Sequence, residues 1–268
     1  MALREKDIEK PYIAAMTERQ YRAEQFGDCY IDFTCRKLAL PPSEPAMNVS
    51  DAIRSRKSVR AFRPDPVPRE TVERILTLAA RAPSGGNLQP WRVYVLLGKA
   101  RERLVARVAE ARKEHPMGFE PEYNIYPPAL HEPYRTRRFR LGEAMYATMN
   151  IPREDKQARP SFFARNWEFF GAPVGLIFTM ERRMQQGQWA DLGMFMENIM
   201  LLAREEGLST CPQESWSQFH PVLREYLSIP ETEMIFCGMA IGHADETAPV
   251  YALESERAPL ADYATIRE

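Results

Sequence analysis

Arg54-Ser-Arg-Lys-Ser-Val-Arg-Ala-Phe62 and Ala82-Pro-Ser-Gly-Gly-Asn-Leu-Gln-Pro-Trp91 are the two stretches around which the rest of the chain is organised. The first holds two arginines around a serine, and the planar guanidinium of arginine can donate two hydrogen bonds to two phosphate oxygens. The second is a turn whose glycines let the backbone approach a flat ring and whose asparagine can pair with ring carbonyl and N–H groups. Each stretch alone is also typical of a solvated charge run or a plain turn. Together they suit a ligand with a phosphate at one end and a flat polar ring at the other.

Length and composition are those of a globular protein. The 268 residues are 44% hydrophobic and carry a formal net charge of −1, which allows one large domain or two small ones. This charge gives no reason to expect nucleic acid or a membrane surface as a partner. No apolar run approaches the roughly 20 residues of a membrane-spanning helix, and the charged segment Met1–Lys10 lacks the apolar core of a secretory signal. We therefore expect a cytoplasmic protein.

The residue types that commonly carry catalysis or bind metal show no familiar spacing. The cysteines fit no CxxC or zinc pattern, so reduced buried thiols are favoured over a disulfide framework for Cys29, Cys35, Cys211 and Cys237. No H-x-x-x-H pair, nucleophile elbow, Walker loop or G-x-G-x-x-G fingerprint occurs. We therefore predict no metal site and no catalytic side chain. A bound cofactor is expected to carry the chemistry, and the two opening stretches suit flavin mononucleotide (FMN).

Hydrophobic periodicity predicts a sheet flanked by helices. Residues 1–47 are predicted to be an N-terminal extension that packs on the body of the protein or on a second subunit, and residues 48–268 to be the main domain. Residues 211–215 are predicted to form a turn, and residues 116–160 an irregular functional loop or lid. Strands are predicted at 92–97, 174–180 and 234–242, and helices at 50–53 (capped by Ser50-Asp51), 69–81, 99–115, 188–206 and 219–227.

Five segments along residues 48–263 occur in one order. They are Arg56-Lys-Ser-Val-Arg60, Ala82-Pro-Ser-Gly-Gly-Asn-Leu-Gln-Pro-Trp91, Gly207-Leu-Ser-Thr-Cys-Pro-Gln-Glu214, Gly238-Met-Ala-Ile-Gly242 and Glu256-Arg-Ala-Pro259. In these segments the chain resembles the nitroreductase family of flavoproteins. The run from Glu132-Pro-Tyr-Arg135 to Ile151-Pro-Arg-Glu-Asp-Lys156 is also similar to a bacterial subgroup that includes nitrobenzoate and nitroaromatic-herbicide reductases.

The resemblance implies a fold and an activity. The fold is α+β and nitroreductase-like, with a central mixed β-sheet flanked by helices, and residues 48–268 form the FMN-binding domain of an intertwined homodimer. The activity is NAD(P)H-dependent and ping-pong: hydride passes to N5 of FMN, and a nitroaromatic substrate is then reduced by two-electron steps from nitro to nitroso to hydroxylamine. The alternatives are another flavin reaction on the same scaffold (reductive dehalogenation, enone or quinone reduction, flavin fragmentation) or a non-catalytic flavin-binding protein.

The resemblance also implies which residues bind the phosphate of FMN. Arg56, Ser58 and Arg60 hold the phosphate end and the pyrimidine edge, and Arg257 closes the phosphate site from the C-terminal tail. Family members often carry a lysine two residues before that arginine, where this chain has a serine. The phosphate is therefore bound either more weakly in this chain or with Lys57 as an additional ligand.

Two further segments are implied to contact the flavin ring. The segment Pro212-Gln213-Glu214 lies along the flavin near N5, where a backbone amide can donate to the nitrogen. The flavin is also reached from the second subunit of the homodimer by Pro83, Ser84, Gly85 and Asn87.

Two groups of residues each allow two interpretations. The first group consists of four arginines, Arg135, Arg137, Arg138 and Arg140. They form either a solvated face or a lid, and the cations of such a lid would bind an acidic substrate or the extra phosphate of NADPH. The second group either lines the flavin pocket or packs in the core, and consists of Trp167, Phe169 and Phe170.

Overall fold

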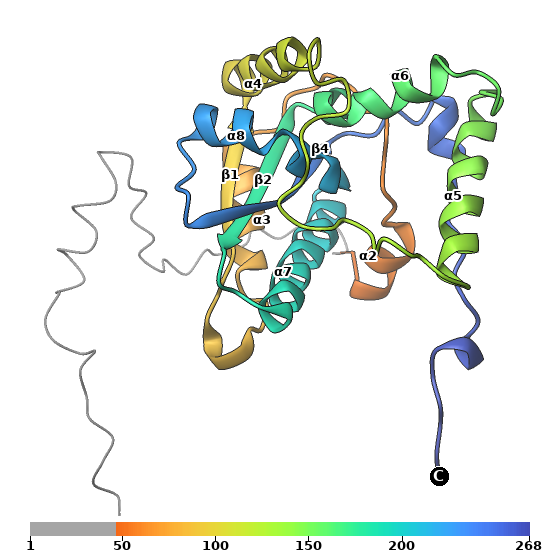
Figure 1. The fold of residues 1–268 in the computed structure, drawn as a ribbon. Helices are drawn as coiled ribbons and strands as arrows, with labels where there is room; N and C mark the ends of the chain where they lie inside the picture. Colours follow the sequence, from red (N-terminus) through yellow and green to blue (C-terminus); the bar gives the residue numbers. More distant parts are fainter. Residues whose placement is uncertain (1–46) are drawn as a thin grey trace, which may run out of the picture. The chain divides into compact units, whose positions relative to one another are not determined.

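A computed structural model of the chain describes residues 47–268. The extension predicted over residues 1–47 therefore lies, apart from Met47, outside the described residues. A sheet of four strands forms the centre of the described domain (Figure 1). The strands lie in the order β1-β2-β4-β3 and comprise β1 (Arg92–Leu97), β2 (Val174–Glu181), β3 (Ser209–Gln213) and β4 (Glu233–Gly242).

The pairing of the strands is antiparallel throughout this sheet. The sequence predicts a mixed sheet, and the one parallel pairing within residues 47–268 is an isolated bridge between Ser58 and Thr210. Leu96 is the one buried residue of β1, because that strand lies at the edge of the sheet. β1 is therefore less buried than its apolar sequence predicts, whereas β2 and β4, in the middle of the sheet, are buried along nearly their whole length.

Seven α-helices and five short 3-10 helices accompany the sheet in the described part of the chain. The 3-10 helices are η1 (Gly85–Asn87), η2 (Arg165–Gly171), η3 (Glu214–Phe219), η4 (Pro249–Ala252) and η5 (Leu260–Asp262). The α-helices are α2 (Val49–Ser55), α3 (Arg69–Ala79), α4 (Gly98–Ala111), α5 (Tyr134–Thr148), α6 (Ala158–Ala164), α7 (Gln186–Glu205) and α8 (His220–Leu227).

Side chains on the two faces of the sheet enter two separate hydrophobic cores. On β2, Leu176 and Phe178 point to the face covered by α3 and α7, whereas Ile177 points to the other face, because successive strand side chains alternate. That second face is covered by α4, α8 and the aromatic residues of η2 and η3. α7 contributes buried residues along its length, as its period of apolar residues predicts: Asp191, Leu192, Phe195, Met196, Ile199, Met200 and Ala203.

Two glycines let η2 and η3 lie close against the sheet. A Cβ at Gly175 would run into the ring of Phe169, and one at Gly238 would run into the indole of Trp216. The two rings stack on each other with centroids 4.3 Å apart. Phe169 has a φ of 53°, a strained value for a non-glycine residue, and the surrounding packing holds it there. Trp167, Phe169 and Phe170 are all buried in this core, so core packing is their observed role.

Three sequence predictions need correction. Residues 116–160 are more regular than predicted, because they contain α5 and the first residues of α6. The turn predicted at 211–215 is instead the end of β3 followed by η3. The cap of α2 is Asn48, whose Oδ1 accepts a hydrogen bond from the backbone N–H of Asp51 at 3.0 Å, and not Ser50-Asp51.

Candidate functional site

The segment Arg56–Arg60 lies alongside β3. Ser58 forms a parallel bridge with Thr210, and the backbone N–H of Val59 donates to the carbonyl of Thr210 at 3.0 Å. These contacts bring together two regions that lie some 150 residues apart in the sequence, and both were predicted to bind one cofactor. Arg56 to Arg60 and Pro212 to Glu214 therefore belong to one region of the structure.

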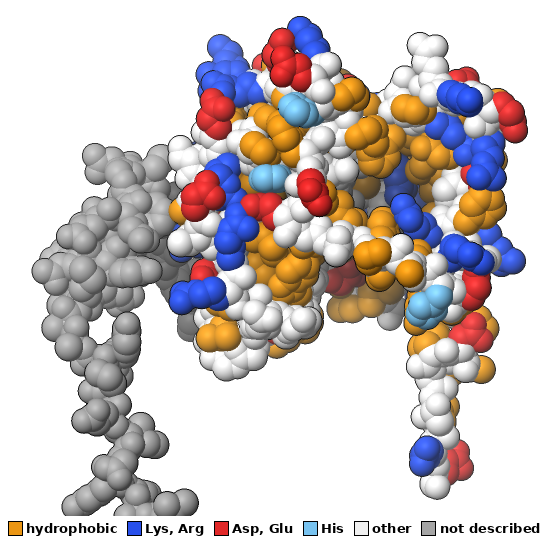
Figure 2. Space-filling model, in the orientation of Figure 1, with side chains coloured by type: hydrophobic (Ala, Val, Ile, Leu, Met, Phe, Trp, Pro, Cys, Tyr) orange, Lys and Arg blue, Asp and Glu red, His pale blue; other side chains and the backbone are white. Residues whose placement is uncertain are grey.

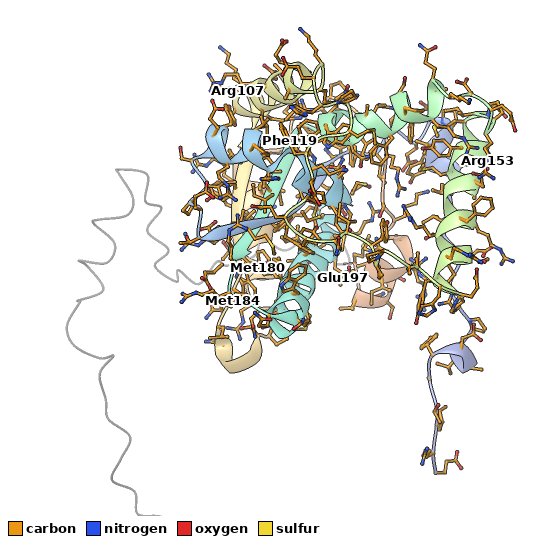
Figure 3. The ribbon with its side chains drawn as sticks, viewed as in Figure 1. Arg107, Phe119, Arg153, Met180, Met184 and Glu197 are labelled. Carbon is orange, nitrogen blue, oxygen red and sulfur yellow. The ribbon has the colours of Figure 1, made fainter. Side chains whose placement is uncertain are left out.

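Arg56 and Arg60 differ in their partners. Nε of Arg56 lies 3.7 Å from Oε1 of Glu197 on α7, and the Arg56 side chain is 18% exposed. Figure 3 labels Glu197 on α7, where that helix passes beside α2. Arg60 donates to the carbonyl of its neighbour Ser58 at 3.0 Å and forms no ion pair within residues 47–268. Its guanidinium is therefore the cation of this segment that is available to an anionic ligand.

The charge of Arg60 acts on both β3 and α5. Burial raises the pKa of the Cys211 thiol on β3 to about 11, and Arg60 opposes that rise. Burial also raises the pKa of the Tyr146 hydroxyl on α5, where the charges of Arg159 and Arg60 act in the opposite direction. The Cys211 thiol and the Tyr146 hydroxyl therefore both lie within electrostatic range of Arg60.

Lys57 is engaged with the C-terminal part of the chain. Its Nζ donates to the backbone carbonyl of Tyr251 at 2.5 Å and lies 3.6 Å from the centroid of the Tyr251 ring. Tyr251 belongs to η4, which packs against α5. In this structure Lys57 thus joins the Arg56–Arg60 segment to η4.

The segment Pro212-Gln213-Glu214 contains one buried polar atom without a partner. Nε2 of Gln213 donates to the carbonyl of Asn166 at 2.7 Å, but Oε1 of Gln213 is buried and accepts no hydrogen bond from the described residues. Glu214 begins η3 directly after β3, and burial raises the pKa of its carboxyl above the ordinary range. This end of β3 can therefore accept a hydrogen bond at Gln213, and the Glu214 carboxyl retains its proton to a higher pH than usual.

The glycine turn is fixed to α7. The backbone N–H of Gly85 donates to Oδ2 of Asp191 at 3.2 Å, and Asp191 is only 6% exposed. Asn87 adopts a φ of 57°, the left-handed conformation that asparagine tolerates better than most residues. Within residues 47–268 no hydrogen bond joins Pro83–Asn87 to the Arg56–Arg60 segment.

Arg257 lies along α5. Its Nη1 donates to the carbonyl of Ser255 at 2.9 Å, to the Ser255 hydroxyl at 2.7 Å and to the carbonyl of Glu256 at 3.0 Å. The same arginine lines a cavity of about 650 Å³ together with Arg137, Arg138 and Arg140 of α5.

Four residues that the sequence motifs do not indicate hold these segments in place. All four accept a hydrogen bond or an ion pair from predicted site residues, and each lies outside the five family-like segments. They are Asp191, Glu197, Tyr251 and Asn166. A signal existed for Asp191, because a carboxylate directly before the buried Leu192 of an apolar helix needs a partner.

Two classes of site find no support in the described residues. No helix within residues 47–268 combines the length and the hydrophobicity needed to cross a membrane. The same residues contain no group of three or more histidines, cysteines and acidic side chains that could hold a metal ion. The candidate site is therefore the arginine segment beside β3 and the elements around it.

Comparisons with known proteins agree with this arrangement. The sequence model of the Nitroreductase family matches residues 53–243. The chain is 44% identical over 221 residues to chloronitrobenzene nitroreductase of Comamonas testosteroni, which covers 81% of this chain and 96% of that protein. It is 40% identical over 226 residues to 4-nitrobenzoate reductase of Nocardioides sp. (82% of this chain, 91% of that protein).

A solved structure shows the same fold. The FMN and NADPH-dependent nitroreductase NfnB from Sphigopyxis sp. strain HMH superposes with a TM-score of 0.80 at 43% identity, over 83% of this chain and all of that chain. The predicted α+β, nitroreductase-like fold is thereby confirmed. The family match spans most of the domain and includes the Arg56–Arg60 segment, the glycine turn and β3. This chain therefore belongs to the nitroreductase family.

Proposed function

We propose that this chain is an FMN-dependent NAD(P)H oxidoreductase that reduces nitroaromatic compounds by two-electron steps, from nitro to nitroso to hydroxylamine. Its relatives are a chloronitrobenzene and a 4-nitrobenzoate reductase, and its structural neighbour is FMN and NADPH-dependent. The observation that carries the proposal is the contact between the arginine segment and β3, where Ser58 pairs with Thr210, two residues before Pro212-Gln213-Glu214.

The residues present fit FMN. Arg56, Ser58 and Arg60 supply two cations and a hydroxyl for the phosphate end, and Arg60 has no competing carboxylate among residues 47–268. The buried, unpaired Oε1 of Gln213 can accept from a ring N–H. Lys57 is held by Tyr251, so in the proposed site it fixes the segment rather than completing the phosphate grip.

The remaining predicted contacts belong to a homodimer. In the proposed dimer the turn Pro83–Asn87, fixed to α7 through Gly85, contacts the FMN of the other subunit. Asp191 then acts as a positioning residue for that turn. The proposed part of Arg257 in the phosphate site also depends on the assembled dimer. We place the enzyme in the cytoplasm.

When bound, FMN would supply the redox chemistry of the proposed mechanism, which is hydride uptake from NAD(P)H and two-electron reduction of the nitro group. The chain contributes binding and electrostatics. Arg60 and the backbone amides at the end of β3 stabilise negative charge that develops at the cofactor. Glu214, whose pKa is raised by burial, can hold a proton at the edge of the site. Substrate protons can also come from solvent, and no side chain is assigned as essential.

An absorbance experiment tests this function. The purified protein is expected to be yellow, to lose its flavin absorbance when NADPH is added, and to regain it with a nitrobenzoate or nitrobenzene. Flavin that NADPH and NADH fail to bleach would indicate a flavin-binding protein without turnover. Flavin that bleaches but is reoxidised only by halophenols or quinones would assign another reaction on this scaffold. Protein that binds no added FMN would contradict the proposal entirely.

A further inference from the structure

A cavity of about 650 Å³ lies between α5 and the C-terminal tail. α5 contributes Arg137, Arg138 and Arg140 to its lining, and the tail contributes Arg257. Figure 2 shows Lys and Arg side chains gathered along this part of the molecule, at the right of the view, around a hollow that separates α5 from the rest of the domain. The proposed function uses Arg257 at the FMN phosphate and assigns no role to the three arginines of α5.

Three of the four arginines have no counter-ion in contact. Arg137 lies 3.5 Å from Asp262, but Arg138, Arg140 and Arg257 form no ion pair with any residue between 47 and 268. The tail also contributes two carboxylates, Glu254 and Glu256, and neither pairs with a described residue. Arginines that line a cavity without a carboxylate in contact are suited to bind an oxyanion, because each guanidinium can donate two hydrogen bonds to it.

A second, apolar cavity of about 480 Å³ adjoins the first. The two share Tyr126, Arg137 and Arg138 in their linings, and Leu130 and Tyr134 add apolar surface to the second. The guanidinium of Arg138 lies 4.0 Å from the centroid of the Tyr126 ring, a cation–π contact that fixes its position between the two cavities. The pair of cavities therefore suits a ligand that carries an aromatic ring next to an anionic group.

The cavity is connected with the proposed flavin site through α5. Arg60 acts on Tyr146 near the C-terminal end of α5, and Lys57 bonds to η4, which packs on the same helix. Arg140 and Arg138 precede Tyr146 by six and eight residues, which is about 9 and 12 Å along a helix axis. A ligand at the flavin site that extends along α5 would point its far end toward these arginines.

We propose that Arg138 and Arg140 bind the oxyanion of a ring-bearing ligand whose reacting end lies at the flavin site. Two ligands of the proposed function carry such a group: a nitroaromatic carboxylate as substrate, and NADPH, through its additional phosphate, as donor. The inference rests on the proposed function for its location. The binding of the oxyanion itself can be measured without turnover.

The test compares Arg138→Gln combined with Arg140→Gln against Arg135→Gln in the FMN-loaded protein. Arg135 lies on the same helix, is paired with Glu132 at 2.9 Å and lines neither cavity. Calorimetry with benzoate reports oxyanion binding without reduction. Steady-state rates with 4-nitrobenzoate and nitrobenzene, and with NADPH and NADH, report which ligand uses the site.

The double variant is expected to lose about tenfold or more in benzoate affinity, or in the ratio of NADPH to NADH utilisation, while Arg135→Gln stays within about twofold of the wild type. Selective loss of kcat/KM for 4-nitrobenzoate over nitrobenzene assigns the site to the substrate, and selective loss for NADPH over NADH assigns it to the donor. Glu254→Gln should act in the opposite direction, because it removes a repelling carboxylate from the cavity.

Equal losses for charged and neutral ligands, with benzoate affinity unchanged, would overturn the inference. α5 has no buried residue, so the variants should fold, and Glu254→Gln provides an independent variant outside α5. If the protein binds benzoate through these arginines but reduces no nitroarene, the oxyanion site is supported and the proposed function is refuted.

Discussion

α7 and α5 are the two longest helices of the described domain, and they are held in place by different forces. α7 has 20 residues, and its buried face packs on the sheet and on α3. α5 has 15 residues and none of them is buried. Its contacts are charged and aromatic: Arg159 donates to Glu143 at 2.7 and 3.0 Å, and the guanidinium groups of Arg159 and Arg153 lie over Tyr146 and Phe139.

Because the two helices are held differently, we expect α7 to support cofactor binding and α5 to determine which ligands bind. Residues on α7 that touch the proposed site, Asp191 and Glu197, stand on a helix that cannot move without opening the core. The arginines of α5 stand on a helix that salt and solvent can reach. We therefore expect changes near α7 and the sheet to affect stability and FMN binding, and changes on α5 to affect ligand preference.

The largest effect is expected from Arg56→Ala combined with Arg60→Ala. Each lost charge-assisted hydrogen bond to the phosphate costs on the order of 1.5–3 kcal/mol, so FMN affinity should fall by a factor of about a hundred or more. Fluorescence titration of FMN into the apoprotein measures this. An affinity within about threefold of the wild type would show that the phosphate lies elsewhere. Arg140→Gln should leave FMN affinity unchanged, because α5 is assigned to other ligands.

A pair of glycine substitutions contrasts the sheet with α5 directly. Gly238→Ala pushes a methyl group into the rigid indole of Trp216, and should destabilise the fold by about 1–3 kcal/mol. Gly142→Ala on α5 meets no atom within 4 Å, and should be neutral or stabilise by about 0.5–1 kcal/mol. Denaturant unfolding of both variants measures the two effects. Equal destabilisation by both would mean that α5 is packed as tightly as the sheet.

Asp191→Ala tests the anchor between α7 and the glycine turn. The substitution leaves the N–H of Gly85 without its acceptor, and should weaken FMN binding by about tenfold through the turn rather than through a direct contact. Asp191→Asn keeps an acceptor oxygen and should recover most of the affinity. If the alanine and asparagine variants bind FMN as the wild type does, the turn is fixed by other contacts.

The smallest effect is expected from pH acting on α5. The hydrogen bond from Arg159 holds the pKa of Glu143 below its ordinary value, so the pair stabilises α5 at neutral pH and this stabilisation is lost as the pH falls through that lowered pKa. Amide hydrogen exchange corrected for intrinsic rates should show lower protection of α5, but not of α7, at the lower pH. Arg159→Gln should reduce protection at neutral pH by about twofold to fivefold and remove the dependence.

The same contrast explains which elements were predictable. α7 and β2 were found from the sequence because each presents a buried apolar pattern. α5 was missed because a helix without a buried face leaves no period in the sequence. β3 was read as a turn because Pro212 has no N–H for a strand ladder, yet β3 pairs with β4 alone among the four strands, and an edge strand tolerates proline.

Much of the candidate site was also predictable, since the family-like segments name its parts. The family, the fold class and the enzyme class are confirmed by the comparisons. The predicted FMN contacts remain predictions, although the structure brings Arg56–Arg60 and β3 together. The family-like segments do not indicate Asp191 and Tyr251, because each accepts a hydrogen bond from a residue more than 100 positions away in the sequence.

The stacked pair of Phe169 and Trp216 has an optical consequence. Trp216 is fully buried, lies two residues after Glu214 and is held face to face with Phe169 on the bare backbone of Gly238. Trp167 is also buried nearby and donates its indole N–H to the carbonyl of Ser215. Two of the four tryptophans of the chain thus surround the start of η3 in fixed, dry positions. Their emission offers a built-in reporter of cofactor loading at the end of β3, readable in the unmodified protein without any attached dye.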